Sequence, residues 1–133
     1  MNNIIALDIG DVQTGIAGLR ENIPFSFESV KTEKLLDQIK EFRTIKKIDL
    51  IIIGLPVSDD GSENDQCRKV RKMALKIDNI VDCDIVLENE YLSSIEAQNN
   101  LRVLGLSPRE IKQKEHSEVA RILLEQYLKN DTR

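Results

Sequence analysis

The feature that most restricts the fold of this chain is an apolar segment near its middle. Residues 48–53 read Ile-Asp-Leu-Ile-Ile-Ile, and the sequence Gly54-Leu55-Pro56 ends the run. A strand that is apolar on both faces is typical of parallel strand pairing with helices covering each side of the sheet. The segment therefore predicts an α/β fold in which a sheet is flanked by helices.

The rest of the chain is consistent with this interpretation. Strands are expected over residues 4–9, 14–19, 25–30 and 84–88, in addition to 48–53. Helices are expected to begin at Thr32, Ser62, Ser93 and Ser107, with a last helix over residues 117–129; Glu96 and Glu110 complete two apparent capping boxes. The prediction is a mixed five-stranded sheet flanked by helices, in a single domain over residues 1–133.

Composition narrows the class of protein. The formal net charge of −4 provides no overall positive field, so a nucleic-acid partner has to be held by local basic patches or metal ions. Two cysteines without C-x-x-C spacing argue against a disulfide framework and favour a reducing compartment. The start of the chain lacks a basic segment and no apolar stretch is long enough to span a bilayer, so we expect a cytoplasmic protein with no membrane partner.

Asp8 lies at the end of the first predicted strand, just before a turn at Gly10-Asp11. A carboxylate buried there is costly unless it is paired or binds a metal, and a glycine turn lets backbone approach a phosphate. The alternative is an aspartate that hydrogen-bonds its own hairpin turn. The D-x-G-x(4)-G pattern also occurs in sugar kinases and actin-like ATPases, but those need a second such turn and a much longer chain.

Three further residues are candidates for a site around Asp8. Glu88 and Glu90 follow a second strand end, and either could meet Asp8 if the two strands are neighbours; spacing does not choose between them. His116, the sole histidine, precedes the last predicted helix and could bind a metal or handle a proton. The alternatives are a solvated acidic loop and a surface histidine.

Substrate contacts are expected from a loop and two basic clusters. The loop from Gly54 to Ser62 follows the buried strand, and ligands of open α/β sheets bind at the carboxyl ends of strands. A helix start at Ser62 would add free N–H groups for a phosphate. The basic residues are Arg68, Lys69, Arg71, Lys72, Arg109, Lys112 and Lys114. Ordinary turn residues and solvated charge runs are the alternative interpretations.

These motifs, in this order, resemble the YqgF/RuvX family of Holliday-junction resolvases and pre-16S rRNA nucleases. The resemblance covers nearly the whole chain. It rests on the first turn, on the segment Ile53-Gly54-Leu55-Pro56 continuing to Asp60-Gly61-Ser62, and on residues 90–97, Glu-Tyr-Leu-Ser-Ser-Ile-Glu-Ala. It implies a ribonuclease H-like fold with three acidic positions at one metal site, which fall on Asp8, Glu90 and His116.

This chain departs from the family at several of these positions. His116 stands for the family's aspartate, Asn89 for an aspartate and Tyr91 for an arginine, and Val12 and Gln13 replace basic residues after the first turn. Two carboxylates and one imidazole carry less charge than three carboxylates, so Mg²⁺ is expected to bind less well and Mn²⁺ to restore part of the binding.

The resemblance implies a metal-dependent nuclease that uses Mg²⁺ or Mn²⁺ on structured nucleic acid, either a ribosomal RNA precursor or branched DNA. Asp8, Glu90 and His116 would form the site, and Gly10, Gly54, Pro56, Gly61, Arg71, Lys112 and Lys114 would contact substrate. The alternative hypothesis is a nucleic-acid-binding module that keeps the fold and has lost efficient catalysis. The oligomeric state is open.

Overall fold

The computed structural model of the protein describes residues 3–131. Residues 1–2 and 132–133 of the predicted domain lie outside the described residues. The first pair belongs to the amino terminus that we expected to carry no signal peptide. The strands are β1 (Ile4–Ile9), β2 (Gln13–Arg20), β3 (Ile23–Ser26), β4 (Val30–Lys31), β5 (Leu50–Leu55) and β6 (Asp84–Asn89). The helices are α1 (Leu35–Ile45), preceded by a 3-10 turn (Thr32–Lys34), α2 (Asp65–Asp78), α3 (Tyr91–Val103) and α4 (Pro108–Asp131).

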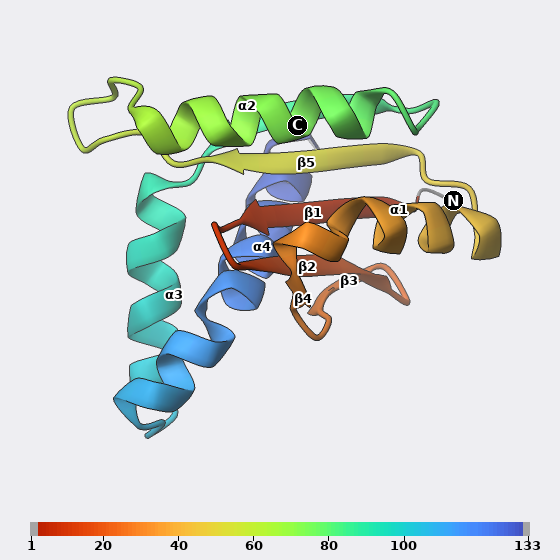
Figure 1. Cartoon of the computed structure of the whole chain (residues 1–133). Helices are drawn as coiled ribbons and strands as arrows, with labels where there is room; N and C mark the ends of the chain where they lie inside the picture. Colours follow the sequence, from red (N-terminus) through yellow and green to blue (C-terminus); the bar gives the residue numbers. More distant parts are fainter. Residues whose placement is uncertain (1–2, 132–133) are drawn as a thin grey trace.

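The strands form one mixed sheet, ordered β3-β2-β1-β5-β6, with β4 paired to β2 (Figure 1). β1 runs antiparallel to β2 and parallel to β5, and β5 runs parallel to β6. The predicted mixed sheet is confirmed, but over the described residues it has six strands, one more than expected. In place of the expected strand over residues 25–30 the structure has the short strands β3 and β4, which pair with opposite ends of β2.

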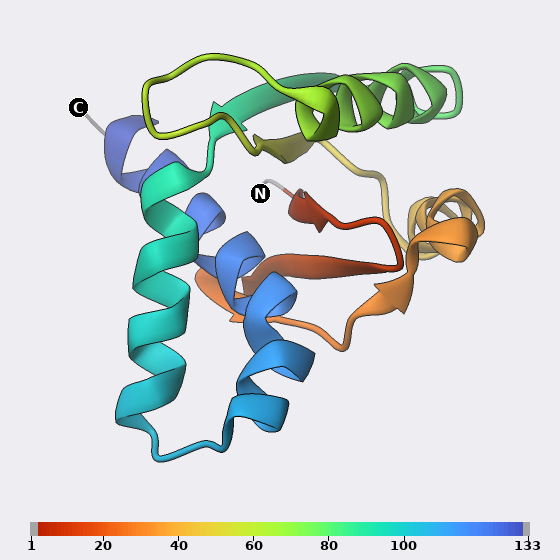
Figure 2. The ribbon, with the colours of Figure 1, turned by 60° about the vertical axis from the view of Figure 1, so that its left-hand side comes forward.

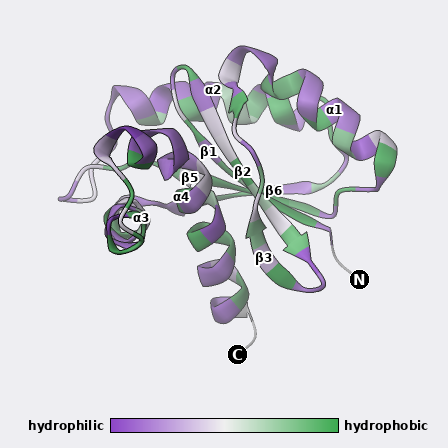
Figure 3. Ribbon diagram, turned by 90° about the horizontal axis from the view of Figure 1, so that it is seen from below, coloured by the Kyte–Doolittle hydropathy of each residue, from purple (hydrophilic) through white to green (hydrophobic). Residues whose placement is uncertain are grey.

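Alternation along β1 assigns its side chains to two cores on opposite faces of the sheet. Ile5, Leu7 and Ile9 join the core beneath α1 and α2, whereas Ile4 and Ala6 join the core beneath α4. Figure 3 shows α1 and α2 on one side of the strands and α4 on the other. Because side chains alternate with a period of two, Asp8 points to the α4 face.

α4 is one continuous helix, so the prediction of separate helices at Ser107 and over residues 117–129 was wrong. The amino-terminal half of α4 extends beyond the sheet beside α3 (Figure 2), where it needs no continuous apolar face. Its polar run at residues 112–115 therefore hides the helical period without interrupting the helix. The predicted capping box is present: Ser107 Oγ accepts from the Glu110 N–H, and Glu110 Oε1 accepts from the Ser107 N–H.

The other three predicted helix starts were wrong in position. α2 begins after Asn64, whose Oδ1 accepts from the Cys67 N–H at 3.0 Å, because Ser62 is held in a turn by Asp60. α3 begins after Glu90, so Ser93 lies inside the helix and the expected capping box with Glu96 does not form. Thr32 opens the 3-10 turn with its side chain directed elsewhere, to the β1–β2 turn. Among residues 3–131, no helix is both long and apolar enough to cross a membrane.

Candidate functional site

Asp8 and His116 are in direct contact at the carboxyl end of β1. The Nδ1–H of His116 donates to Asp8 Oδ2 at 2.6 Å, and the Asp8 side chain is only 7% exposed. His116 reaches Asp8 because it continues the stripe of α4 that covers the sheet: Ala120 and Leu124, at spacings of four, lie in the core beneath this helix. The contact explains how the carboxylate of Asp8 is accommodated inside the protein.

This hydrogen bond changes the proton affinity of His116. The bond to Asp8 raises the pKa of His116 above its usual value, and the nearby negative charge adds to this effect, while burial opposes it. The imidazole is therefore stabilised in its protonated form when no other cation lies beside Asp8. A bound metal ion would reverse this preference, because two cations beside one carboxylate repel each other.

Glu90 brings a second carboxylate to the same place. It lies between β6 and α3 and is 7% exposed, and its Oε2 atom is buried with no hydrogen-bond partner among residues 3–131. β6 is not the neighbour of β1, because β5 lies between them. Glu90 therefore has to reach across the end of β5, where the residue is Gly54. A Cβ atom at Gly54 would collide with Glu90 Oε2, so the absence of a side chain there makes room for the carboxylate.

The charge of Glu90 is poorly compensated. Burial, together with the nearby Asp8 carboxylate, raises the pKa of Glu90 to about 9. Such a shift means that the metal-free site holds a proton on Glu90 at neutral pH. Buried carboxylates with strongly raised pKa values are typical of functional sites, since a structural role rarely requires them.

The two carboxylates of the site suit a hard divalent cation. Asp8 and Glu90 offer carboxylate oxygens, one of which is buried without a partner, and Mg²⁺ and Mn²⁺ prefer such oxygens. The Nδ1 atom of His116 is bonded to Asp8. Over the described residues no three His, Cys, Asp or Glu side chains are already arranged as a metal-binding group. The carboxylate pair thus fits a metal ion, while His116 as observed supports Asp8.

The turn between β1 and β2 is fixed by two threonines that the sequence analysis did not identify. Thr32 Oγ1 donates to the carbonyl of Gly10 at 2.7 Å and contacts the hydroxyl of buried Thr14 at 2.9 Å. Gly10 also has to be small, because a Cβ atom would lie 2.9 Å from the His116 ring. Thr32 follows a strand directly, and the sequence analysis interpreted this position as the N-cap of a helix. These contacts hold the backbone next to Asp8 in one conformation.

The loop after β5 uses most of its polar groups internally. The carbonyl of Pro56 accepts from Asn64 Nδ2 at 3.0 Å, and Gly61, at a φ of +84°, closes a turn with Ser58. Arg71 makes two hydrogen bonds to the carboxylate of Glu63. These expected substrate contacts therefore have partners within the loop and α2.

The second basic cluster is divided between two sides of α4. Lys112 lines a hollow of about 550 Å³ together with His116, next to the β1–β2 turn. Lys114 lines a different hollow, beside Ser117 and the β3–β4 segment. Arg109 lines the same hollow as Lys112, so these two expected basic residues lie on the side of His116 and Lys114 does not.

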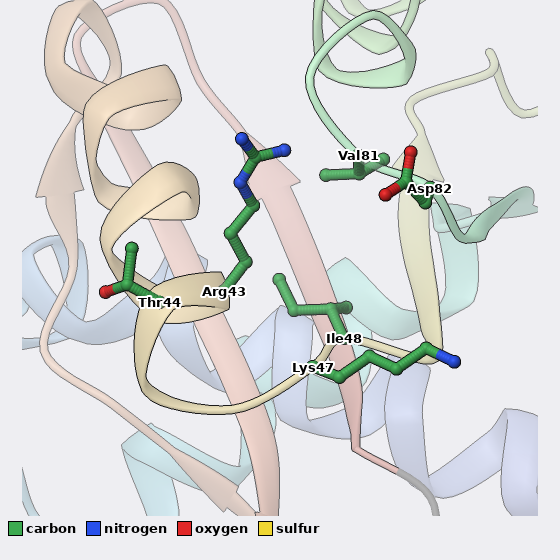
Figure 4. Close-up of a pocket in the computed structure, with 6 residues that line it drawn as sticks. All are labelled: Arg43, Thr44, Lys47, Ile48, Val81 and Asp82. Atoms are coloured by element: carbon green, nitrogen blue, oxygen red, sulfur yellow. The ribbon is translucent and has the colours of Figure 1, made fainter.

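A separate hollow of about 400 Å³ lies at the opposite end of the sheet (Figure 4). It is bordered by Arg43 and Lys47 at the end of α1, by Ile48 just before β5, and by Asp82 before β6. Since Asp8 and Gly54 lie at the carboxyl ends of parallel β1 and β5, this hollow is remote from them. Arg43 donates to the carbonyl of Ile80 there, which ties α1 to the end of α2.

Comparison with known proteins is consistent with this arrangement. A protein from Maridesulfovibrio salexigens named "Putative pre-16S rRNA nuclease" is 32% identical over 130 residues, covering 94% of this chain and 96% of that protein. A protein of the same name from Chloroflexus aurantiacus is 28% identical and covers 94% and 85%. The solved structure of T. thermophilus RuvC in complex with Holliday junction substrate matches with a TM-score of 0.62 at 12% identity, over 92% of this chain and 90% of that one.

The likeness to RuvC confirms the predicted ribonuclease H-like fold. The model of one protein family, described as "RuvX: Holliday junction resolvase", matches residues 2–130 of this sequence. The match spans both strand ends that carry the carboxylates and the helix that carries His116. The chain therefore belongs to the RuvX family.

Proposed function

We propose that this protein is a cytoplasmic, metal-dependent nuclease that hydrolyses phosphodiester bonds in structured nucleic acid. The observation that carries the proposal is the buried carboxylate pair, in which Glu90 Oε2 has no partner and the pKa of Glu90 is raised to about 9. In the metal-free site Glu90 keeps its proton at neutral pH, and a bound cation would compensate the charge of the ionised pair.

Asp8 and Glu90 would hold the Mg²⁺ or Mn²⁺ ion, since both are buried and offer oxygen ligands. A divalent ion in this position supplies Lewis-acid stabilisation of the charge that develops on the phosphate. His116 orients the Asp8 carboxylate through their hydrogen bond. We keep the prediction that His116 completes the metal-binding set, which requires its ring to be neutral and to present a free nitrogen.

A ribosomal RNA precursor is the substrate that we favour over branched DNA. The two curated relatives carry the pre-16S rRNA name, and they cover the chain almost from end to end. The family description names Holliday junctions, so a four-way DNA junction is the second substrate to test.

The second candidate function is a nucleic-acid-binding module with weakened catalysis. The observation that favours it is the use of residues near Glu90 for helix capping. Asn89 Oδ1 accepts from the Tyr91 N–H at 2.9 Å. The residue that stands for a family aspartate therefore stabilises the first turn of α3. A neutral Asn89 and a neutral His116 leave the site with fewer charges to balance metal ions.

Cleavage of a pre-16S rRNA fragment and of a four-way DNA junction, each with Mg²⁺ and Mn²⁺, tests the proposal. Asp8→Asn and Glu90→Gln should each lower the rate by at least about 100-fold, because each removes a charged ligand. Glu88→Gln, in β6 two residues before Glu90, is the matched control and should retain the parent rate. Cleavage by Asp8→Asn at the parent rate contradicts the proposed site, and inactivity of the parent on both substrates favours the binding module.

A further inference from the structure

The hollow beside His116 has features that the metal centre does not account for. It is formed by the β1–β2 turn on one side and by the first half of α4 on the other, with a volume of about 550 Å³. Its lining includes Val12, Gln13, Arg109, Lys112, Gln113 and His116. Since His116 also contacts Asp8, the hollow and the metal centre share a wall.

The charge at this hollow is positive and uncompensated. Arg109 and Lys112 form no ion pair within residues 3–131, whereas Arg68, Lys69 and Arg71 are each paired with an acid. The acid in the lining, Asp11, lies 3.3 Å from Lys69 Nζ, which offsets part of its charge, so the two unpaired cations leave the hollow net positive. The hollow therefore attracts an anion such as a phosphodiester.

Its neutral lining suits a base better than a second phosphate. Val12 is 70% exposed and gives the lining of the hollow an apolar surface against which a base can lie. Gln13 Oε1 accepts from Ser29 Oγ at 3.4 Å, which leaves its amide N–H groups free to donate. Gln113, on the opposite wall, offers another amide. Amide groups present a donor and an acceptor side by side, which match the edge of a nucleobase.

We propose that this hollow holds one unpaired nucleotide of the substrate, adjacent to the phosphodiester that the Asp8–Glu90 centre cleaves. This inference rests on the proposed nuclease function. The base lies against Val12 with its edge toward Gln13 and Gln113, and the flanking phosphates face Arg109 and Lys112. The base presents its Watson–Crick edge to the two amides, and because pairing occupies this edge in a duplex, the occupant is single-stranded or flipped out of its stack.

Base-dependent binding, measured without metal, tests the proposal separately from cleavage. Fluorescence anisotropy in EDTA compares a labelled single-stranded RNA octamer with an octamer of equal length and charge whose internal residues are abasic. The parent should bind the base-containing octamer about tenfold more tightly, equivalent to one well-bound base. Val12→Glu should reduce this ratio to about twofold or less, and Gln113→Ala should lower it in part.

Ile23→Glu is the matched control, because Ile23 is a β-branched apolar residue that is 65% exposed. It begins β3 and pairs with Arg20 at the far end of β2, away from the hollow. The variant should keep the parent ratio, and the ratio itself cancels the repulsion that any added glutamate exerts on both oligonucleotides.

Equal affinity of the parent for the two octamers, or an unchanged ratio in Val12→Glu, overturns the pocket. If such a result accompanies metal-dependent cleavage, the proposed function stands without this nucleotide site. A tenfold affinity ratio between the two octamers in the parent, lost in Val12→Glu, supports the pocket. If the parent shows this ratio but cleaves neither substrate, the nuclease function is overturned and the nucleotide-binding site remains.

Discussion

Gly54 and Glu90 share one volume at the carboxyl edge of the sheet. The Glu90 carboxylate occupies the space that any side chain at residue 54 would fill. A Cβ atom at residue 54 would also lie 2.8 Å from Leu123 Cδ1 of α4. Through the contact at Gly54 a glutamate at the end of β6 reaches across β5 toward Asp8. The geometry of the carboxylate pair therefore depends on a residue without a side chain.

Gly54→Ala should destabilise the protein and displace Glu90. Forcing a methyl group into an occupied core site costs about 1–3 kcal/mol, and chemical denaturation measures the loss. In a Glu90→Ala background the same substitution should cost at least about 1 kcal/mol less, because the colliding carboxylate is gone. Glu88→Ala, at the residue opposite Gly54 in the sheet register, is the control that should not relieve the cost. Strict additivity of Gly54→Ala and Glu90→Ala would contradict the shared volume.

Glu90→Gln should stabilise the metal-free protein at neutral pH. The folded protein keeps a proton on Glu90 up to about pH 9, whereas the unfolded chain releases it near 4.5. Folding stability therefore decreases as the pH rises from 4.5 toward 9, and the glutamine variant lacks this decrease. At pH 7 the difference reaches about 3 kcal/mol, from 1.36 kcal/mol for each pH unit.

Urea unfolding in EDTA at pH 5 and pH 7 measures this effect, with Glu88→Gln as the control. The two proteins, parent and Glu90→Gln, should differ little at pH 5 and most at pH 7. A Glu90→Gln variant that is less stable than the parent at pH 7 would show that the Glu90 charge is already compensated in the metal-free protein.

His116→Asp should tighten Mg²⁺ binding. The substitution places a third carboxylate beside Asp8 and Glu90, which raises the repulsion in the metal-free site and the gain on binding a cation. Calorimetry should show Mg²⁺ affinity rising by about tenfold or more. In the parent, Mn²⁺ affinity should fall as the pH drops below about 9, because Mn²⁺ has to displace the proton of Glu90. The fall should be steeper than in His116→Asp once the imidazole is protonated, at a pKa that Asp8 raises above its usual value. Equal Mg²⁺ affinity in the parent and His116→Asp would exclude residue 116 from the metal ligands.

Glu118 should stabilise the junction of α3 and α4 in a pH-dependent way. Its carboxylate accepts from Asn100 Nδ2 at 3.0 Å and from Arg121 Nε at 2.9 Å. Burial pushes the pKa of Glu118 upward, but these hydrogen bonds outweigh it and hold the pKa below 4.5. Glu118→Gln should therefore cost about 1–2 kcal/mol at pH 7.

This cost should be present above pH 4.5 and be lost as the pH falls through the lowered pKa of the folded state, because the parent is then protonated too. Asp65→Asn, which breaks an exposed ion pair with Arg68, is the matched control and should cost less than about 0.5 kcal/mol at either pH. Thermal unfolding at pH 7 and pH 3 measures both variants, and an equal cost for Glu118→Gln at both pH values would contradict the charge-dependent role.

The sequence predicted the class of fold because its signals are local. The apolar run at residues 48–53 and the strand at Ile4–Ile9 show which segments are buried on both faces, and β1 has the predicted bounds. Helix starts were harder to predict, since a serine or threonine caps a helix only if no other contact takes its hydroxyl. Thr32 bonds to Gly10 and Ser62 to Asp60, so neither acts as the cap that its position suggested.

The sequence by itself determined that Asp8 ends a buried strand and that a carboxylate there needs a partner, because burial and its electrostatic cost follow from the strand pattern alone. Only the tertiary structure decided which partners it has. His116 is 108 residues away and meets Asp8 because α4 crosses the sheet on the face to which Asp8 points. Glu90 arrives over the intervening strand at Gly54. Such contacts depend on how separate elements pack against one another, and this packing leaves no periodic signal in the chain.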